Sequence, residues 1–334
     1  METIKVLGVG FSCVDIVKMI EHSFVSFGGT TGNVITILSQ LGYETRLLTA
    51  DYSGELGDWY KRALEIRNIT PIYFQKSNKR ISVVVEEVNS TNGTHFFRTT
   101  CPRCGNSLIN VILPSVEKVV GFRSQMEYCN LLFFDRFSAG INFLANANVD
   151  GWNVYEPNAF RMYGNLLNGC RAADIIKFSA ERIPDRVCNQ LLLDLESSMP
   201  QIVIVTMGKD GLRFCVKKDK EWGAWNYLSS RSSENVVDTA GAGDWLTAGF
   251  LHGLLSEYPV KQRIPEEKVI EKLQRAQTLA TVACSYMGAQ GILKDSNGID
   301  LLRTITKCNF WRIQDSDIDD QLKCLVCGST GIGK

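Results

Sequence analysis

A glycine-rich run that ends in an aspartate is the segment of this sequence best suited to chemistry. Asp238-Thr239-Ala240-Gly241-Ala242-Gly243-Asp244 stands between a short apolar stretch and an amphipathic stretch of helical period that continues to Leu255. Glycines let main-chain N–H groups approach a phosphate closely, and the start of the following helix adds the positive end of its dipole. Gly241, Ala242 and Gly243 therefore predict an anion-binding site.

Asp244 falls in the first turn of that expected helix. Transfer of a phosphoryl group to an alcohol needs a carboxylate that accepts the hydroxyl proton, a contribution of about 10²–10⁴ in rate. We predict Asp244 to be this base. The alternative is a plain glycine-rich turn whose aspartates cap a helix, and composition alone favours that alternative.

A second pair of glycines stands in the N-terminal half, in Phe27-Gly28-Gly29-Thr30-Thr31-Gly32-Asn33. Paired glycines allow a ligand to lie against the main chain, and the amide of Asn33 offers a donor and an acceptor to a hydroxyl group. A plain helix N-terminus is the simpler interpretation. Asp15 lies after the first predicted strand, where a lone aspartate is usually a turn residue.

In this order, the two segments resemble motifs of the PfkB (ribokinase-like) family of carbohydrate kinases, and the resemblance spans roughly residues 4–293. It implies that Asp244 activates a sugar hydroxyl and that Gly241, Ala242 and Gly243 bind the transferring phosphate. It also implies an acceptor site made by Asp15, Gly28, Gly29 and Asn33. An ATP-dependent phosphotransferase acting on a sugar or sugar derivative is the expected function.

The resemblance also implies residues that bind ATP and Mg²⁺. The nucleotide contacts fall on Thr206, Gly208 and Gly211 of a Thr-x-Gly-x-x-Gly turn, on Thr239, and on Gly288 of Gly288-Ala289-Gln290. The chain departs from the family at Ser179-Ala180-Glu181-Arg182, where Asn-x-x-Glu is usual. Glu181 is one position early and is expected to reach the water shell of Mg²⁺. Trp245 replaces a small residue after the base and predicts a narrower acceptor pocket.

Four of the eleven cysteines lie outside apolar segments, in two Cys-x-x-Cys-Gly pairs. Such a pair has the shape of a zinc knuckle, in which the turn aims two thiolates at one metal ion. Cys101 and Cys104 with Cys324 and Cys327 would supply four ligands for a structural Zn²⁺ if the C-terminal tail folded back. Free or redox-active thiols are the alternative.

The elements that must position these residues follow from the apolar pattern. Short apolar runs typical of buried parallel strands alternate with longer segments of helical period. Examples of these runs are Ile4–Val9, Asn130–Phe134, Asn153–Tyr155, Asp174–Phe178 and Ile202–Thr206. Strands separated by helices predict a mainly parallel sheet covered on both faces. The fold class is α/β, a three-layer sandwich that the resemblance specifies as ribokinase-like.

One stretch breaks this alternation. Arg80–Glu87 and His95–Arg98 are predicted strands joined by Ser90-Thr91-Asn92-Gly93, and Asn-Gly is a strong hairpin signal. We predict a small β-hairpin lid over residues 71–104, inserted in a kinase domain of residues 1–70 and 105–307, with a tail over residues 308–334. The exposed edge of the lid could pair with a second copy to form a homodimer.

The charge balance narrows the class of partner. Lys and Arg total 36, Asp and Glu total 36, and the pI is about 6.8. No net field favours nucleic acid or an anionic membrane, so a small molecule is the expected partner. The first residues lack a targeting pattern, and no apolar run approaches the ~18 residues of a spanning helix, so a cytoplasmic protein is expected.

Two other functions stay open. A nucleoside kinase of the same fold would differ only in its acceptor. A catalytically weak, kinase-like binding or scaffolding protein is the other, and it is motivated by the altered segment around Glu181 and by the cysteine-containing tail.

Overall fold

A central sheet of ten strands organises the part of the chain that the computed structural model describes, residues 3–18, 23–88, 95–101, 104–123, 129–158, 162–195, 200–219, 221–231 and 235–314. Its strand order is β13-β12-β11-β10-β9-β8-β1-β4-β5, with β14 beside β12. The strands are β1 (Lys5–Val9), β4 (Glu44–Tyr52), β5 (Ile69–Ser77), β8 (Leu131–Phe134), β9 (Trp152–Tyr155), β10 (Ile175–Ser179), β11 (Ile202–Thr206), β12 (Leu212–Lys218), β13 (Glu221–Trp222) and β14 (Asn226–Leu228).

Every neighbouring pair from β5 to β11 is parallel, and β12 pairs with β11 antiparallel. The central strands are mainly apolar and buried, as in the Leu131-Leu132-Phe133-Phe134 run of β8. Strands of this kind are expected where helices cover both faces of a sheet. The α/β sandwich with a mainly parallel sheet is thereby confirmed.

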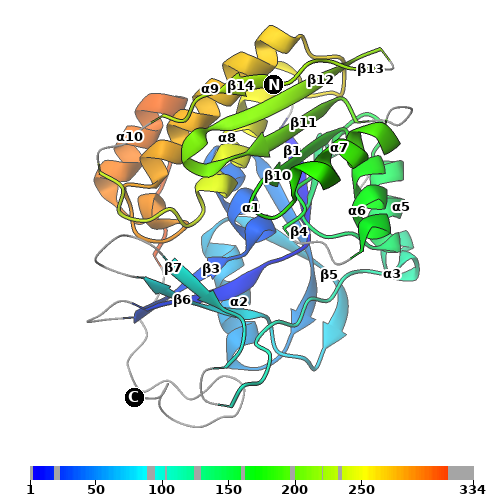
Figure 1. Ribbon diagram of the computed structural model, residues 1–334. Coiled ribbons are helices and arrows are strands. Elements are labelled where there is room, and N and C mark those ends of the chain that lie inside the picture. The colour runs from blue at the N-terminus through cyan, green and yellow to red at the C-terminus, as the bar shows by residue number, and fades with distance from the viewer. Residues whose placement is uncertain are drawn as a thin grey trace.

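Helices flank the sheet on both sides. Figure 1 shows α8 (Ala242–Glu257), α9 (Glu266–Ala283) and α10 (Ser296–Thr306) on one side, and α5 (Ala139–Ala147), α6 (Tyr163–Arg171) and α7 (Asp185–Asp194) on the other. α1 (Thr30–Gln40) packs against α8, α2 (Glu55–Ile66) packs against β5, and the short α3 (Val116–Val120) packs against α5. The contact between α1 and α8 brings together the two glycine-containing segments.

A separate four-stranded sheet contains the two strands of the expected lid, and we call it the lid sheet. Its order is β3-β2-β6-β7, with β2 (Cys13–Lys18), β3 (Ser23–Gly28), β6 (Val83–Val88) and β7 (His95–Arg98), and it lies below the central sheet in Figure 1. β6 and β7 are antiparallel, whereas β2 and β6 are parallel. The Asn92-Gly93 turn lies outside the described residues.

The lid differs from the expected residues 71–104 in two ways. It also contains β2 and β3, and β5 continues through residue 77 as part of the central sheet. The parallel pairing of β2 with β6 joins segments far apart in sequence, and no local turn signal reveals such a pairing. As a result, Asp15 and Gly28 belong to the lid sheet.

The first residues of the expected tail pack on the main body. Phe310 and Ile313 are buried, and the N–H of Ile313 donates to the carbonyl of Leu293 at 2.8 Å. The tail expected from residue 308 therefore begins as part of the core, and residues 315–334 lie outside the described part of the chain.

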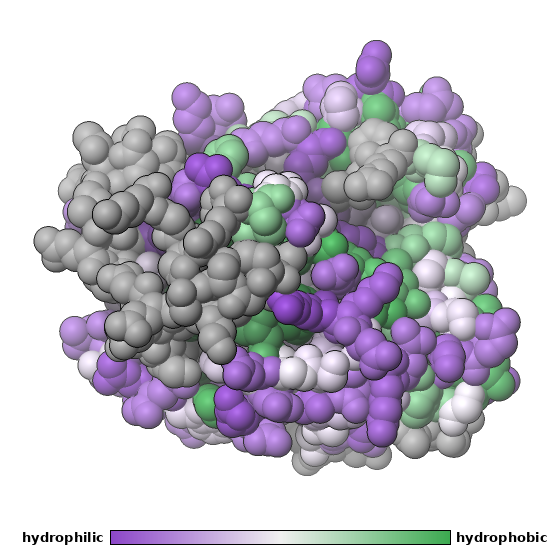
Figure 2. All heavy atoms as spheres, turned by 90° about the horizontal axis from the view of Figure 1, so that it is seen from below, coloured by the Kyte–Doolittle hydropathy of each residue, from purple (hydrophilic) through white to green (hydrophobic). Residues whose placement is uncertain are grey.

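The lid side of the molecule is seen in Figure 2. Hydrophilic residues predominate over the described part of this face, and some hydrophobic residues are visible in its central hollow. Within the described ranges, no helix combines the length and apolar character needed to cross a membrane.

Candidate active site

The glycine run forms the entry to α8. Gly241 adopts a left-handed conformation with φ 75° as the N-cap residue, and a Cβ atom there would lie 2.5 Å from that of Ala289. The first intrahelical hydrogen bond runs from the N–H of Trp245 to the carbonyl of Gly241 at 2.9 Å. The N–H groups of Gly243 and Asp244 therefore precede the hydrogen-bonded ladder and point out of the helix N-terminus, as anion binding requires.

Asp238 holds this entry in place. It is fully buried, and its Oδ1 accepts the N–H of Ala240 at 2.9 Å while its Oδ2 accepts the N–H of Gly288 at 2.8 Å. One carboxylate thus joins the glycine run to the Gly288 turn. Two of the segments expected to contact ATP are adjacent for this reason, whereas the side chain of Thr239 is exposed between them.

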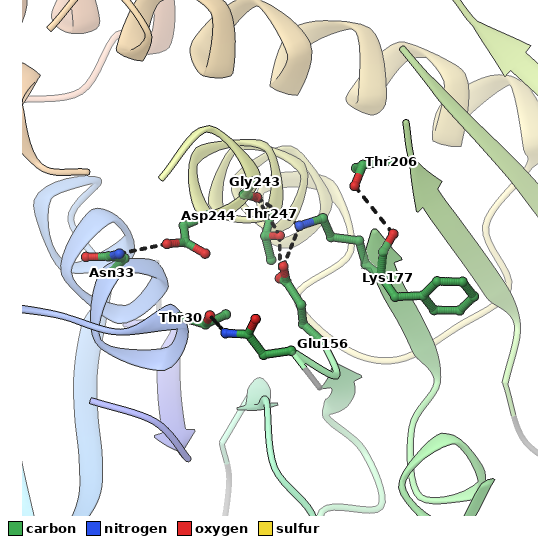
Figure 3. A network of polar contacts seen from close by, with 10 residues as sticks. Thr30, Asn33, Glu156, Lys177, Thr206, Gly243, Asp244 and Thr247 are labelled. Carbon is green, nitrogen blue, oxygen red and sulfur yellow. Dashed lines mark hydrogen bonds and ion pairs between the residues drawn. The ribbon is translucent and has the colours of Figure 1, made fainter. Parts of the chain in front are cut away.

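The catalytic candidate meets α1 directly. Nδ2 of Asn33 donates to Oδ2 of Asp244 at 2.7 Å, across the packed helices α1 and α8. Figure 3 shows these two side chains pointing toward one another. Gly29, with φ 84°, is the N-cap residue of α1 and passes close to the carbonyl of Phe11, where a Cβ atom would lie at 2.6 Å. This glycine allows α1 to begin beside the loop after β1.

A buried ion pair supports the other side of Asp244. Nζ of Lys177 donates to Oε1 of Glu156 at 2.5 Å and to the carbonyl of Gly243 at 3.0 Å. Oγ1 of Thr247 donates to the other oxygen of Glu156 at 2.6 Å and also contacts the carbonyl of Gly243 at 3.0 Å. Figure 3 shows this network converging on the start of α8. It fixes the main chain immediately before the catalytic candidate.

The surroundings of Asp244 suit a base that works near neutral pH. Burial is the largest influence and, with the nearby Glu156 carboxylate, raises the pKa of Asp244 to about 7. The hydrogen bond from Asn33 and the charges of Lys177 and Arg182 oppose this rise. A carboxylate with a pKa near the working pH is partly ionised and is also basic enough to accept a proton.

Asp15 and Gly28 form one edge of the expected acceptor site. The Asp15 side chain crosses the face of Gly28, where any Cβ atom would overlap its Oδ2. Burial raises the pKa of Asp15 to about 6, opposed by a hydrogen bond from the Cys13 thiol at 3.1 Å and by the charge of Lys294. Glycine at position 28 is therefore required by the carboxylate that lies on it.

Three carboxylates surround the start of β2. Burial raises the pKa of the Cys13 thiol, and the charges of Asp15, Asp135 and Asp244 raise it further. The sequence analysis missed Asp135, which follows β8 and accepts the N–H of Phe11 at 2.7 Å and the hydroxyl of Thr31 at 3.0 Å. Asp135 thus holds the loop after β1 to the first turn of α1, beside the acceptor residues.

The remaining nucleotide candidates lie at the ends of β10 and β11. Thr206 ends β11, with its hydroxyl 3.4 Å from the carbonyl of Phe178, and Gly208 and Gly211 adopt φ values of 58° and 94° in the following turn. Glu181 is exposed, and its Oε1 lies 3.9 Å from the position of a Cβ atom at Gly208. Glu181 therefore lies beside the turn that is expected to contact ATP.

Trp245 does not line the acceptor pocket as its sequence position suggested. Its side chain is fully buried, and the indole N–H donates to the carbonyl of Ala289 at 2.9 Å. Residue 245 is one helical step past Asp244, which turns its side chain about 100° away from that of the base. Trp245 instead fastens α8 to the loop that contains Gly288.

The cysteine candidates are only partly described. Cys101 is buried and Cys104 is exposed, whereas Cys324 and Cys327 lie outside the described residues. Within the ranges that the structure covers, no three His, Cys, Asp or Glu residues gather in a group that could hold a metal ion.

Sequence reasoning also missed the buried support for these residues, especially Lys177, Thr247 and Arg67. Lys177 had a signal, because a lysine inside the apolar β10 strand demands a buried anionic partner. Glu156 was not singled out as a site residue. Its partnership with Lys177 and Thr247 depends on the spatial order of β9, β10 and α8.

Comparisons with known proteins find relatives of this chain among the carbohydrate kinases. Residues 179–296, which include the glycine run, match the model of the pfkB family carbohydrate kinases. The chain is 28% identical over 254 residues to an ATP-dependent 6-phosphofructokinase of Thermoanaerobacterium thermosaccharolyticum, covering 71% of this chain and 75% of that protein. It is 24% identical over 311 residues to a fructokinase of Escherichia coli, covering 85% and 95%.

Among solved structures, a ribokinase from Giardia lamblia has a TM-score of 0.71 with this chain at 16% identity. The match covers 91% of this chain and 100% of the ribokinase. The likeness of fold therefore extends beyond the residues that the family model matches.

Proposed function

We propose that this chain, which belongs to the PfkB family of carbohydrate kinases, transfers the γ-phosphoryl group of ATP to a hydroxyl group of a sugar or sugar derivative. The observation that carries the assignment of roles is the contact between Asn33 and Asp244 at the N-terminus of α8. It places a carboxylate of nearly neutral pKa beside main-chain N–H groups that suit a phosphate.

In the proposed reaction, Asp244 accepts the proton of the acceptor hydroxyl as the oxygen attacks the γ-phosphorus. The new O–P bond forms while the bond from the γ-phosphorus to the bridging oxygen breaks, and ADP leaves. The N–H groups of Gly243 and Asp244 stabilise the charge on the transferring group. Asp15 and the main chain at Gly28 and Gly29 hold the other hydroxyl groups of the acceptor.

The ion pair between Lys177 and Glu156 supports this reaction by position. Only 4% of the Lys177 surface is exposed, and its contact with the carbonyl of Gly243 fixes the peptide that precedes Asp244. Phosphoryl transfer depends mainly on positioning and on charge stabilisation. A fixed α8 entry therefore serves both the base and the phosphate site.

ATP and a divalent cation are implied by the family, and the residues present fit both. The exposed carboxylate of Glu181 beside Gly208 suits Mg²⁺ held partly through water. Both oxygens of Glu156 are already engaged by Lys177 and Thr247, which makes Glu156 the poorer ligand. When bound, Mg²⁺ neutralises negative charge on the phosphates.

The acceptor is testable with a panel of sugars, sugar phosphates and nucleosides, with ADP release as the measurement. We expect turnover of at least one free sugar and little turnover of nucleosides. Rapid phosphorylation of a nucleoside with no sugar used would establish the nucleoside kinase instead. ATP binding without turnover of any acceptor would favour a binding or scaffolding role.

A homodimer through the lid is the further expectation on partners. β7 is an edge strand of the lid sheet, and Phe96 on it is 60% exposed. Unpaired strand edges and exposed aromatic side chains favour association. Sedimentation of wild-type protein and of Phe96→Lys would test this: a dimer that the substitution dissociates supports it, and a wild-type monomer contradicts it.

A structural Zn²⁺ on Cys101, Cys104, Cys324 and Cys327 stays a proposal. The N–H of Gly105, which has φ 71°, donates to the carbonyl of Cys101 at 2.9 Å and closes a turn compatible with a knuckle. Metal analysis of purified protein is the test. One zinc per chain that is lost in Cys101→Ser supports the site, and four freely titratable thiols without zinc contradict it.

A further inference from the structure

We propose that Arg67 and Gln290 are positioning residues for Asp244, acting through Asn33. The four side chains form one chain of hydrogen bonds whose donor direction is set by Arg67. This inference rests on the proposed function, because it assumes that Asp244 is the base. It gives a positioning role to Arg67 and Gln290, which do not contact either substrate in the proposed reaction.

The chain begins at a buried guanidinium. Arg67 is 0% exposed, its Nε donates to Oε1 of Gln290 at 3.0 Å, and its NH1 donates to the carbonyl of Ala63 at 3.1 Å. The guanidinium also lies 5.3 Å from the ring centre of Phe27, on its face. These contacts fix the orientation of the guanidinium group, next to the end of β3 that contains Gly28.

Gln290 can accept these contacts in only one orientation. It is 1% exposed, and its Nε2 donates to Oδ1 of Asn33 at 2.9 Å and to the carbonyl of Phe27 at 2.7 Å. Turning the amide over would place its N–H groups against Arg67, a pure donor, and its oxygen against two acceptors. Arg67 therefore fixes which end of Gln290 faces Asn33.

The same logic passes to Asn33. Its Oδ1 is held by Gln290, so its Nδ2 must face Asp244, where it donates at 2.7 Å. A reversed amide would set oxygen against carboxylate and leave Gln290 without an acceptor. The hydrogen bond to Asp244 favours the ionised form and lowers its pKa, against the effects of burial and Glu156.

Arginine is suited to the start of such a chain. It has five N–H donors and no acceptor, and it stays protonated at every accessible pH. The orientation of both amides is therefore independent of pH, whereas Asp244 at the end of the chain titrates. The chain keeps a donor pointed at the base through the whole working range.

The test compares two substitutions of Gln290. Gln290→Glu still accepts from Arg67 but loses both donors, and Gln290→Met loses them without adding a charge. For both variants we expect the acid limb of the kcat/KM profile to move to higher pH by about one unit, and kcat to fall at least about tenfold, with little change in the KM for ATP.

Controls separate positioning from stability. Ser39→Ala removes a 2.6 Å hydrogen bond to the main-chain carbonyl of Arg67. It leaves the hydrogen bonds from Arg67 to Asp244 intact, so the acid limb of its kcat/KM profile should stay in place. Arg67→Lys keeps a charged donor and should retain the profile of the wild type better than Arg67→Met. If the Gln290 variants unfold, the two Arg67 variants provide the comparison.

An unchanged acid limb in Gln290→Met would overturn the inference. A shift in Gln290→Glu alone would overturn it as well, because the added negative charge would then account for the shift. Asp244→Asn is measured in parallel. If that variant keeps full activity, the proposed base is wrong, and this failure is distinct from an unmoved limb in the Gln290 variants.

Discussion

Asn33 and Asp244 are joined by a 2.7 Å hydrogen bond between the first turns of α1 and α8, two helices that begin at separate glycine segments. The bond brings a residue of the expected acceptor site next to the glycine run that is expected to bind the phosphate. In-line transfer between two bound molecules requires this adjacency.

The rate should depend on pH through Asp244. Its pKa is raised to about 7, so the carboxylate is largely protonated below pH 7 and cannot accept a proton. We expect kcat/KM to fall about tenfold per pH unit well below 7 and to level off above it. Measurement with saturating ATP between pH 5.5 and 9 checks this. A flat profile across pH 6 to 8 would contradict it.

Asp15→Asn should weaken acceptor binding selectively. The carboxylate lies across Gly28 at the expected acceptor site, and a hydrogen bond to a charged group contributes about 1.5–3 kcal/mol. The KM for the sugar should therefore rise about 10-fold to 100-fold, with the KM for ATP nearly constant. An equal rise in both values would show that Asp15 supports the fold of the site and not the acceptor.

Lys177→Met should destabilise the protein strongly. The substitution leaves the Glu156 carboxylate buried without its ion-pair partner, which typically costs about 3–5 kcal/mol. Urea unfolding measures this free energy, and adding Glu156→Gln should restore part of it. The exposed pair of Arg275 with Glu271 is the control, because Arg275→Met should change stability by under about 1 kcal/mol. A small effect of Lys177→Met would contradict the buried pairing.

Glu86 should make stability depend on pH. It lies in β6 with 3% of its surface exposed, and among the described residues its Oε1 has no hydrogen-bond partner. Burial raises its pKa from 4.5 to about 8, helped by the charges of Asp238 and Asp15. The folded protein therefore keeps a proton that the unfolded chain loses, and stability declines as pH rises from about 4.5 to 8.

Glu86→Gln removes this decline. Relative to the wild type, we expect little change in the free energy of unfolding at pH 5 and a gain on the order of 3 kcal/mol at pH 9. Thermal or urea unfolding measures this difference. Glu87→Gln on the same strand serves as the control, since Glu87 is paired with Arg98 at the surface. A gain that is equal at both pH values would show that Glu86 does not titrate in this window.

Much of the fold was predictable because its strands are buried runs with a clear apolar pattern. The five apolar runs named from the sequence correspond to β1, β8, β9, β10 and β11, and the two predicted hairpin strands correspond to β6 and β7. The glycine segments were also recognisable, because the positive φ angles at Gly29 and Gly241 favour glycine over other residues.

The rest depends on contacts between distant segments. The β2–β6 pairing, the partners of Lys177 and the path from Arg67 to Asp244 join residues from different parts of the chain. Trp245 was misjudged because the side of α8 that it occupies depends on the position of Ala289. A charged side chain in an apolar segment, such as Lys177, is the signal that such a partner exists.

The most direct test of the account is phosphoryl transfer by Asp244→Asn, measured as sugar phosphate formed per enzyme with the best acceptor. Asparagine keeps the size of the side chain but cannot take the proton. We expect a loss of about 10²-fold or more in kcat, with the KM for ATP nearly unchanged and with Asp300→Asn on the exposed face of α10 fully active. A kcat of Asp244→Asn within a factor of two of the wild type would contradict the central claim.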